Sequence, residues 1–364
     1  MKHGGDIYTE GVLKGKELTD FSSNINPLGV PKSFINNLNE GVLNLTRYPD
    51  IQYRELRGNL KEYVNSGEIL FNIGDERLNI VEEEDFILGN GAAEIIQLSI
   101  SLFKSIAIIV PSFGEYDENA EKYGLKITYI PMRNMEYDYD AIERSLKNND
   151  ALIIGNPNNP NGGIIDKGKF KTLLDFCERE GKTVIVDEAF IEFTGNMRQS
   201  FLYELKSYKC LLIIRALTKF YGMPGIRMGY GISKNGKLLE KMRKSQNPWN
   251  INAFAELAAK YVLKDKEYIN ESLKWIREER KFLVEEMNKV PHIKKAYHTF
   301  GNYILCELEE IDGDKLYELC LEKGIVIRKC CNYKGLNNRF IRFAIKDREN
   351  NNILLNTLKG IKNI

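Results

Sequence analysis

The sequence contains few of the residues that hold metal ions or covalent cross-links. It has only three histidines, and none of its six cysteines forms a CxxC pair. The adjacent Cys330 and Cys331 are poorly suited to a zinc site. We therefore expect no metal centre, and we expect the cysteines to be packing residues of a reduced protein.

The sequence also lacks a charge excess and a long apolar run. Its 52 basic and 51 acidic side chains give a formal net charge of +1, so no overall attraction to nucleic acid or to an anionic membrane follows. No apolar run approaches the roughly 20 residues that a membrane-spanning helix requires. The first six residues contain no apolar leader segment. We expect a cytoplasmic protein that binds neither nucleic acid nor membrane.

The 364-residue sequence has the proportions of hydrophobic (43%) and charged (28%) residues that are usual in globular proteins. Short apolar runs alternate with amphipathic segments in the middle of the chain. We predict strands at 106–110, 126–130, 151–155, 183–186, 211–214 and 228–232, and helices that include 92–103, 115–123 and 167–179. Several strands are almost wholly apolar, as strands covered on both faces must be. The alternation predicts an α/β fold with a mostly parallel sheet wrapped by helices.

The pattern changes at about residue 250. A long, largely helical stretch at 253–289 precedes predicted strands at 303–307, 326–328 and 340–344 and helices at 313–322 and 347–358. This predicts a smaller α+β domain beside the large one. We divide the chain into an N-terminal arm that joins the small domain (1–40), a large domain (41–250) and a small C-terminal domain (251–364).

Lys219 and Asp187 are the first candidates for chemistry. Lys219 follows a buried apolar strand, where an ammonium must be paired or neutralised. Desolvation lowers the pKa of a lysine, which suits a Schiff-base lysine; the alternative is a helix-start lysine that reaches solvent. Asp187 follows the strand 183–186, and the carboxyl ends of parallel strands face the ligand crevice. Its carboxylate could pair with the protonated ring nitrogen of a bound pyridine-type group, or it could be an ordinary helix N-cap.

Two loops accompany these residues. The segment 155–163, Gly-Asn-Pro-Asn-Asn-Pro-Asn-Gly-Gly, offers asparagine donors and acceptors in a loop that prolines and glycines restrict. The segment 88–94, Leu-Gly-Asn-Gly-Ala-Ala-Glu, is a small-residue turn that opens a helix. Free backbone N–H groups and the helix dipole favour a phosphate there. Taken alone, each segment is also consistent with a simple turn.

The order of these features resembles the fold type I pyridoxal-phosphate enzymes over almost the whole chain: a glycine-rich helix start, an Asn-Pro loop, a strand-ending aspartate, and a lysine followed eight residues later by arginine. The resemblance implies a transferase-like fold with pyridoxal 5′-phosphate as cofactor. Lys219 would carry the cofactor and Asp187 would pair with its ring nitrogen. The other implied contacts are Gly91, Ala92, Ala93, Thr218 and Arg227 at the phosphate, Phe113 on the ring face, and Asn159 at the ring hydroxyl.

Tyr48 matches a tyrosine that reaches the cofactor phosphate of a neighbouring subunit, which implies a homodimer with shared active sites. The chain departs from the usual pattern at three positions. Phe190 stands where tyrosine often helps to hold the ring hydroxyl, and Asn161 stands where threonine is usual. Ala216 stands where a serine often binds the phosphate. These departures imply a leaner phosphate site and one hydrogen-bond donor fewer at the ring oxygen.

Within this group the chain resembles the threonine-phosphate decarboxylases of cobalamin biosynthesis, relatives of the histidinol-phosphate aminotransferases. The resembling segments are 3–6, 20–29, 187–193, 217–221, 247–252 and 327–333. The resemblance implies decarboxylation of O-phospho-L-threonine to (R)-1-aminopropan-2-ol O-phosphate. The candidates for binding the substrate's phosphate and carboxylate are His3, Asn24, Arg328 and Arg342. Arg342 matches the arginine that grips the substrate carboxylate in such enzymes, but the residues alone leave open which anion each arginine meets.

Other interpretations remain at this stage. Arg328 also fits a surface salt bridge, His3 a disordered terminus, and Asn24 a turn before Pro27. The same cofactor residues would serve a transaminase acting on histidinol phosphate. A non-catalytic regulator with this fold would carry a fused DNA-binding segment; because the fold motifs begin almost at Met1 and the net charge is near zero, we expect none. Phosphothreonine and phosphoserine differ by one methyl group, a difference that sequence does not resolve.

Overall fold

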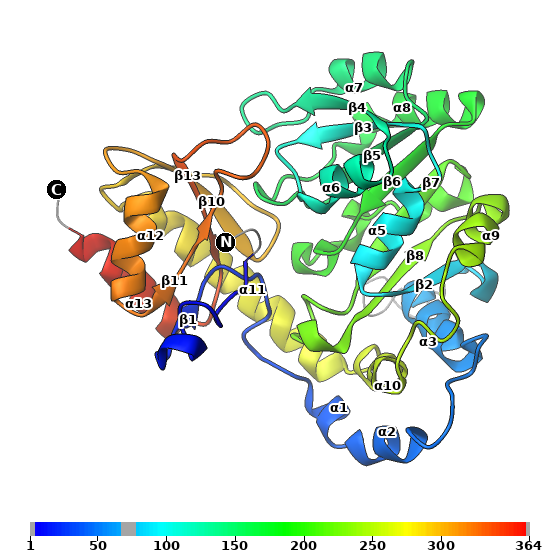
Figure 1. Cartoon of the computed structure of the whole chain (residues 1–364), viewed down its shortest axis with the longest axis horizontal. Coiled ribbons are helices and arrows are strands. Elements are labelled where there is room, and N and C mark those ends of the chain that lie inside the picture. Colours follow the sequence, from blue (N-terminus) through cyan, green and yellow to red (C-terminus); the bar gives the residue numbers. More distant parts are fainter. Residues whose placement is uncertain (1–3, 67–77, 362–364) are drawn as a thin grey trace.

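The computed structural model describes residues 4–66 and 78–361, and a seven-stranded sheet lies inside the larger body of the molecule (Figure 1). Only β8 runs antiparallel to its neighbours, while the other pairs are parallel. The predicted α/β fold with a mostly parallel sheet is confirmed, but β2 was not among the predicted strands. In spatial order the strands are β2 (Phe86–Asn90), β8 (Met228–Ile232), β7 (Leu211–Ala216), β6 (Thr183–Asp187), β5 (Ala151–Gly155), β3 (Ser105–Val110) and β4 (Lys126–Pro131).

Both faces of this sheet are buried, as the apolar strands predicted. In β6 the side chains of Val184 and Val186 join one apolar cluster, and that of Ile185 joins another on the opposite face. This alternation follows from the two-residue period of a strand. The helices that the strands of this sheet connect to are α5 (Ala92–Ile100), α6 (Glu115–Lys122), α7 (Tyr139–Leu146), α8 (Lys167–Glu180) and α9 (Gly236–Lys244).

A second, antiparallel sheet lies beside the first and is built mainly from the C-terminal part of the chain (Figure 1). Its strands, in spatial order, are β12 (Arg328–Lys329), β13 (Phe340–Ala344), β10 (Tyr303–Leu308) and β9 (Ile293–Ala296). The accompanying helices are α12 (Gly313–Glu322) and α13 (Arg348–Gly360). The N-terminal segment joins this side of the molecule, because β1 (Thr19–Asp20) pairs in parallel with β11 (Ile325–Val326). The backbone N–H of Phe21 continues the pairing by donating to the Val326 carbonyl at 2.8 Å.

Two predicted elements differ in detail. The strand predicted at 326–328 is wrong as a single element, because β11 and β12 belong to different sheets and Ile327 separates them. The helical stretch at 253–289 is confirmed, but it consists of α10 (Ala253–Val262) and α11 (Lys266–Met287). Asp265 starts the second helix by accepting a hydrogen bond from the Tyr268 N–H at 3.0 Å, as an N-cap residue does.

The remaining helices lie mostly in the N-terminal quarter, where α1 and α2 form an arm at the edge of the molecule (Figure 1). Among residues 4–66 and 78–361, no helix has the length and apolar character that crossing a membrane requires. The helices not named above are η1 (Val12–Lys14), α1 (Lys32–Ile35), α2 (Leu38–Asn44), α3 (Arg54–Asn65), η2 (Glu83–Asp85), η3 (Ile191–Thr194), η4 (Met197–Gln199), η5 (Tyr203–Lys206) and η6 (Pro224–Ile226).

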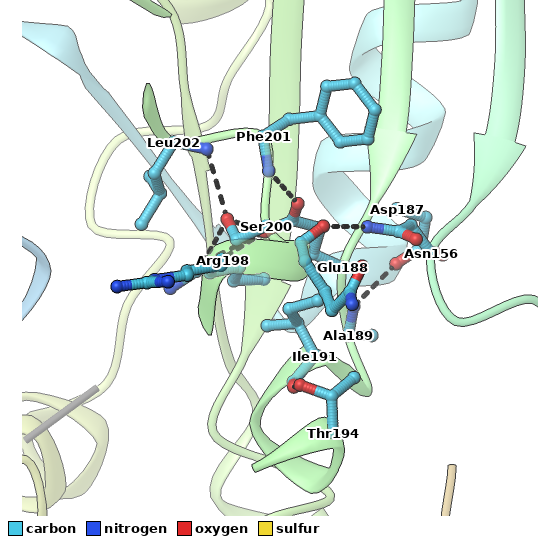
Figure 2. A network of polar contacts seen from close by, with 12 residues as sticks. Asn156, Asp187, Glu188, Ala189, Ile191, Thr194, Arg198, Ser200, Phe201 and Leu202 are labelled. Atoms are coloured by element: carbon cyan, nitrogen blue, oxygen red, sulfur yellow. Dashed lines mark hydrogen bonds and ion pairs between the residues drawn. The ribbon is translucent and has the colours of Figure 1, made fainter. Parts of the chain in front are cut away.

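A buried ion pair joins Arg215 in β7 to Glu188, the residue that follows β6. Arg215 and Glu188 are fully buried, and their side chains meet at 2.9 Å. The Glu188 carboxylate also accepts hydrogen bonds from the Ser200 hydroxyl and the Phe201 backbone N–H, both at 2.7 Å (Figure 2). A buried charge is tolerated when it is paired and hydrogen-bonded in this way. The network ties the loop at 199–202 to the end of β6 and so holds the backbone next to Asp187.

Candidate active site

A cavity of about 460 Å³ lies between the two sheets, at the carboxyl ends of the parallel strands, where ligands bind in open α/β sheets. It brings together most of the predicted site residues. Those that line it are Asn24, Ala92, Ala93, Phe113, Asn159, Asp187, Thr218, Lys219, Arg227, Arg328 and Arg342.

Lys219 follows β7 and lines the cavity beside the buried Thr218. Desolvation lowers the pKa of Lys219 to about 8, and the positive charges of Arg342 and Arg227 lower it as well. Asp20 acts in the opposite direction. A lysine with this pKa is partly uncharged near neutral pH, so its amine can act as a nucleophile.

Cofactor capture by the cofactor-free protein should therefore depend on pH. Only the uncharged amine attacks a carbonyl, so the rate of capture should rise with pH and level off above about 8, the pKa of Lys219. The rate is measured by following the absorbance of added pyridoxal 5′-phosphate from pH 6.5 to 9.5. A rate still rising steeply at pH 9.5 would contradict the lowered pKa.

Asp187 ends β6 and is buried. One carboxylate oxygen accepts a hydrogen bond from the Tyr116 hydroxyl at 2.6 Å, and the other accepts one from the Ala189 N–H at 3.0 Å. Burial raises the pKa of Asp187, and these two donors oppose the rise. A cation placed against the carboxylate would favour its charged form, so the site suits a protonated ring nitrogen.

Asn159 connects the two sheets. Its side-chain oxygen accepts hydrogen bonds from Arg342 Nη1 and from the Tyr333 hydroxyl, the latter at 3.1 Å. The second amino group of Arg342 donates to the Ser22 carbonyl at 2.8 Å. The amide nitrogen of Asn159 is therefore the group left to serve as a donor toward the cavity.

Small residues shape the other end of the cavity, where α5 begins. Gly91 precedes the helix with φ = 77° and provides no side-chain cap, so the first N–H groups of the helix remain suitable for an anion. A Cβ on Gly91 would lie 2.5 Å from the Nη2 atom of Arg227. This close approach fits a phosphate held jointly by the helix start and a guanidinium.

Arg328 and Arg342 are paired across β12 and β13 and are only 4% and 5% exposed. Arg328 donates to the Lys329 carbonyl at 2.7 Å and to the Asn332 side chain at 2.9 Å. Like charges opposite each other on neighbouring strands are unfavourable. Two guanidinium groups that line one cavity favour an anionic ligand there.

The N-terminal segment closes the cavity near these arginines. Asn24 is 2% exposed, and within the described residues its side-chain oxygen has no hydrogen-bond partner. Gly4 lies so close to Ser22 that a Cβ would come within 2.1 Å of the Ser22 carbonyl oxygen. His3, the remaining predicted substrate residue, lies outside the described residues.

Tyr48 does not line this cavity. It is 77% exposed and its ring lies 4.7 Å from that of Trp249, beside a separate hollow. Two of the three departures, Phe190 and Ala216, line the cavity, and the Phe190 ring contacts that of Tyr303 edge-on at 5.0 Å.

The sequence interpretation assigned no role to Tyr116 or Tyr333. Tyr116 holds Asp187, and Tyr333 holds Asn159 and Arg342. The sequence gives little indication of either role. Tyr116 is marked only by its position in the helix turn after Phe113, and Tyr333 only by its position in the segment that follows Arg328. Neither pattern specifies a partner. Among the residues that the structure describes, no three His, Cys, Asp or Glu side chains are placed to hold a metal ion.

The residues present fit pyridoxal 5′-phosphate. Lys219 supplies the amine, Asp187 an acceptor for the ring nitrogen, and Asn159 a donor for the ring oxygen. Arg227 and the start of α5 supply a phosphate site, and Phe113 supplies an aromatic face.

The comparisons agree with this arrangement. The family model for aminotransferases of class I and II matches residues 16–358. A protein of Caldanaerobacter subterraneus, provisionally named a threonine-phosphate decarboxylase, is 36% identical, with 99% of this chain and 94% of the relative covered. The threonine-phosphate decarboxylase of Salmonella typhimurium is 32% identical over 99% of this chain and 96% of its own. The crystal structure named as the histidinol-phosphate aminotransferase from Clostridium acetobutylicum is 51% identical and covers 93% of this chain and 98% of its own, with a TM-score of 0.88.

Proposed function

Because the chain belongs to the class I and II aminotransferase family and is a pyridoxal 5′-phosphate enzyme, we propose that it decarboxylates O-phospho-L-threonine to (R)-1-aminopropan-2-ol O-phosphate. Relatives with threonine-phosphate decarboxylase names cover nearly the whole chain. The main rival is transamination of histidinol phosphate, the activity named for the 51% identical structure.

The observation that carries this proposal is the pair of buried arginines on neighbouring strands. Arg328 and Arg342 line the same cavity as Lys219. O-Phosphothreonine carries a phosphate and a carboxylate on one small molecule, and so offers one anionic group to each guanidinium. Histidinol phosphate carries only the phosphate. It therefore offers an anionic group to only one of the two arginines.

The arginines would also select the reaction. Bound at this site, the cofactor supplies an electron sink for the pair released at the substrate's Cα. Which Cα bond breaks depends on how the substrate is rotated, and two anion contacts fix that rotation. Arg342 is the candidate for the carboxylate and Arg328 for the phosphate.

Lys219 would handle the proton. With the substrate amine bound in its place, the Lys219 side chain would be available in the cavity to move a proton, and burial in the cofactor-free cavity lowers its pKa to about 8. When the bond between Cα and the carboxylate breaks, carbon dioxide leaves and Cα requires one proton. The Lys219 ammonium would donate that proton. Asp187 would stabilise the charge on the ring nitrogen throughout.

The test is to incubate the pure cofactor-loaded protein with O-phospho-L-threonine and no oxo-acid. Sustained carbon dioxide release with formation of aminopropanol phosphate is the expected result. No carbon dioxide, together with conversion of the cofactor to its amine form by histidinol phosphate, would overturn the proposal in favour of a transaminase.

We also propose that the protein is a homodimer with shared active sites. Nine of the large apolar side chains that are exposed lie between residues 28 and 51, on and around α1 and α2: Leu28, Val30, Ile35, Leu38, Val42, Leu43, Leu45, Tyr48 and Ile51. An exposed apolar patch of this kind marks an interaction surface. Tyr48 belongs to the patch, which supports its proposed reach into the neighbouring subunit.

Leu43→Lys should weaken the dimer. Leu43 is 74% exposed, so lysine is harmless in a monomer but places a charge in an apolar interface. We expect the dimer dissociation constant to rise at least about tenfold, measured by sedimentation velocity. Leu13→Lys is the matched control, because Leu13 is 78% exposed but belongs to η1. A wild-type protein that sediments as a monomer would contradict the proposal.

A further inference from the structure

Tyr333 lies between the groups assigned to the cofactor and those assigned to the substrate. It is only 6% exposed and lines the cavity. Its hydroxyl donates to the side-chain oxygen of Asn159 at 3.1 Å and accepts from Arg342 Nη1 at 3.1 Å. Its ring lies 5.1 Å from the guanidinium carbon of Arg328. One side chain thus contacts both candidate anion-binding arginines and the candidate donor to the cofactor ring.

These contacts determine which way the Asn159 amide faces. A guanidinium can only donate hydrogen bonds, so the Asn159 atom that meets Arg342 must be the oxygen. The Tyr333 hydroxyl uses its single proton on the same oxygen. Within residues 4–66 and 78–361, the amide nitrogen of Asn159 has no hydrogen-bond acceptor, and Asn159 lines the cavity. Two donors on the oxygen therefore keep the nitrogen directed to the cofactor side.

Phe190 makes this orientation more important. It lines the cavity and has no hydroxyl, so it cannot donate to the cofactor's ring oxygen. Asn159 then carries that role without the second donor that a tyrosine would supply. An amide that turned over would present its oxygen to another oxygen, an unfavourable contact.

We propose that Tyr333 is a positioning residue that couples the two halves of the site. It holds the Asn159 amide with its nitrogen toward the cofactor, and it holds Arg342 and Arg328 in place for the substrate anions. The proposal rests on the proposed function only for the identity of those anions. The coupling itself requires the cofactor and a ligand with two anionic groups.

The test compares Tyr333→Phe with Tyr129→Phe in the cofactor-loaded protein. Tyr129 is a matched control, because its hydroxyl is also hydrogen-bonded and its ring also lies beside a cation. The hydroxyl contacts Asp117, and the ring lies 3.6 Å from Lys334, the residue next to Tyr333, but Tyr129 does not line the cavity. The first readout is the pH midpoint of the cofactor's visible absorption. The second is the dissociation constant of 3-phosphoglycerate, which has the carboxylate and phosphate of phosphoserine but no amine.

For Tyr333→Phe we expect the pH midpoint of the cofactor's visible absorption to rise by at least about 0.5 pH units. Without the Tyr333 hydroxyl the Asn159 amide is a weaker donor to the cofactor's ring oxygen, so it stabilises the deprotonated form of the cofactor less. We expect the dissociation constant of 3-phosphoglycerate to rise about fivefold. Tyr129→Phe should leave both quantities within about twofold or 0.2 pH of the wild type. A Tyr333→Phe protein with lower thermal stability but unchanged midpoint and affinity would overturn the proposal.

A second variant isolates the coupling. Asn159→Ala removes the amide, so adding Tyr333→Phe to it should leave the absorption midpoint unchanged. Additive shifts in the double variant would also overturn the proposal. Neither readout needs turnover, so both can be measured even in a protein that releases no carbon dioxide from O-phosphothreonine. Failure of the coupling is in this way separated from failure of the proposed reaction.

Discussion

Lys219→Ala should abolish carbon dioxide release from O-phospho-L-threonine, with a loss of at least about 10⁴-fold, because the lysine would both carry the cofactor and move the proton. The variant should still bind the cofactor, since Arg227, Thr218 and the start of α5 remain. Product formation measured by mass spectrometry gives the rate. Borohydride reduction of the wild type should add the cofactor mass to the peptide that contains Lys219.

Lys346→Ala is the matched control for this variant. Burial also lowers the pKa of Lys346, but Lys346 is not among the residues that line the cavity. The Lys346→Ala variant should keep its activity within a few-fold of the wild type, and in the wild type Lys346 should not carry the cofactor mass after reduction. If the cofactor mass appeared on another lysine in the wild type, the assignment of Lys219 would be wrong.

Asp187→Asn should lower activity about 10³-fold while leaving the fold intact. Asparagine has the same shape, and its side-chain oxygen can still accept the N–H of Ala189. A neutral amide, however, does not stabilise a protonated ring nitrogen, and buried electrostatic stabilisation of this kind contributes factors of roughly 10²–10³ or more. The change is measured as kcat with the protein saturated in cofactor.

Asp138→Asn provides the control for that substitution. Asp138 begins α7 by accepting a hydrogen bond from the Ala141 N–H at 3.0 Å, a role that asparagine fills equally well. Its activity should match that of the wild type. An Asp187→Asn protein with activity within about tenfold of the wild type would show that the carboxylate charge is not used.

The sequence was sufficient to predict the residues at strand ends, because local rules govern them. Apolar runs of four or five residues predict buried strands, and in the structure Asp187 ends β6 and Lys219 follows β7 of the same sheet. Carboxyl ends of parallel strands meet at one edge, so the two side chains were expected to share a cavity, and they line the same one.

Other features depend on contacts between distant segments. The Tyr116 hydroxyl reaches Asp187 across 71 positions, and the Tyr333 hydroxyl reaches Asn159 across 174. No local pattern encodes such partners. β2 was missed for a related reason, since its Gly89 and Asn90 suggest a turn and its extended form depends on pairing with β8. The break at Ile327 likewise arises because β11 and β12 pair with different strands.

The joining of the N-terminal segment to the second sheet has a consequence for synthesis of the protein on the ribosome. The Ser22 carbonyl accepts its hydrogen bond from Arg342, 320 positions later, and the Phe21 carbonyl accepts one from the Ala344 N–H. All seven strands of the sheet around Lys219 and Asp187 lie before residue 233, so they have been synthesised once β8 is complete. The first residues made must instead wait for nearly the last, so the segment that closes the cavity can reach its place only after the strands of both sheets have been synthesised.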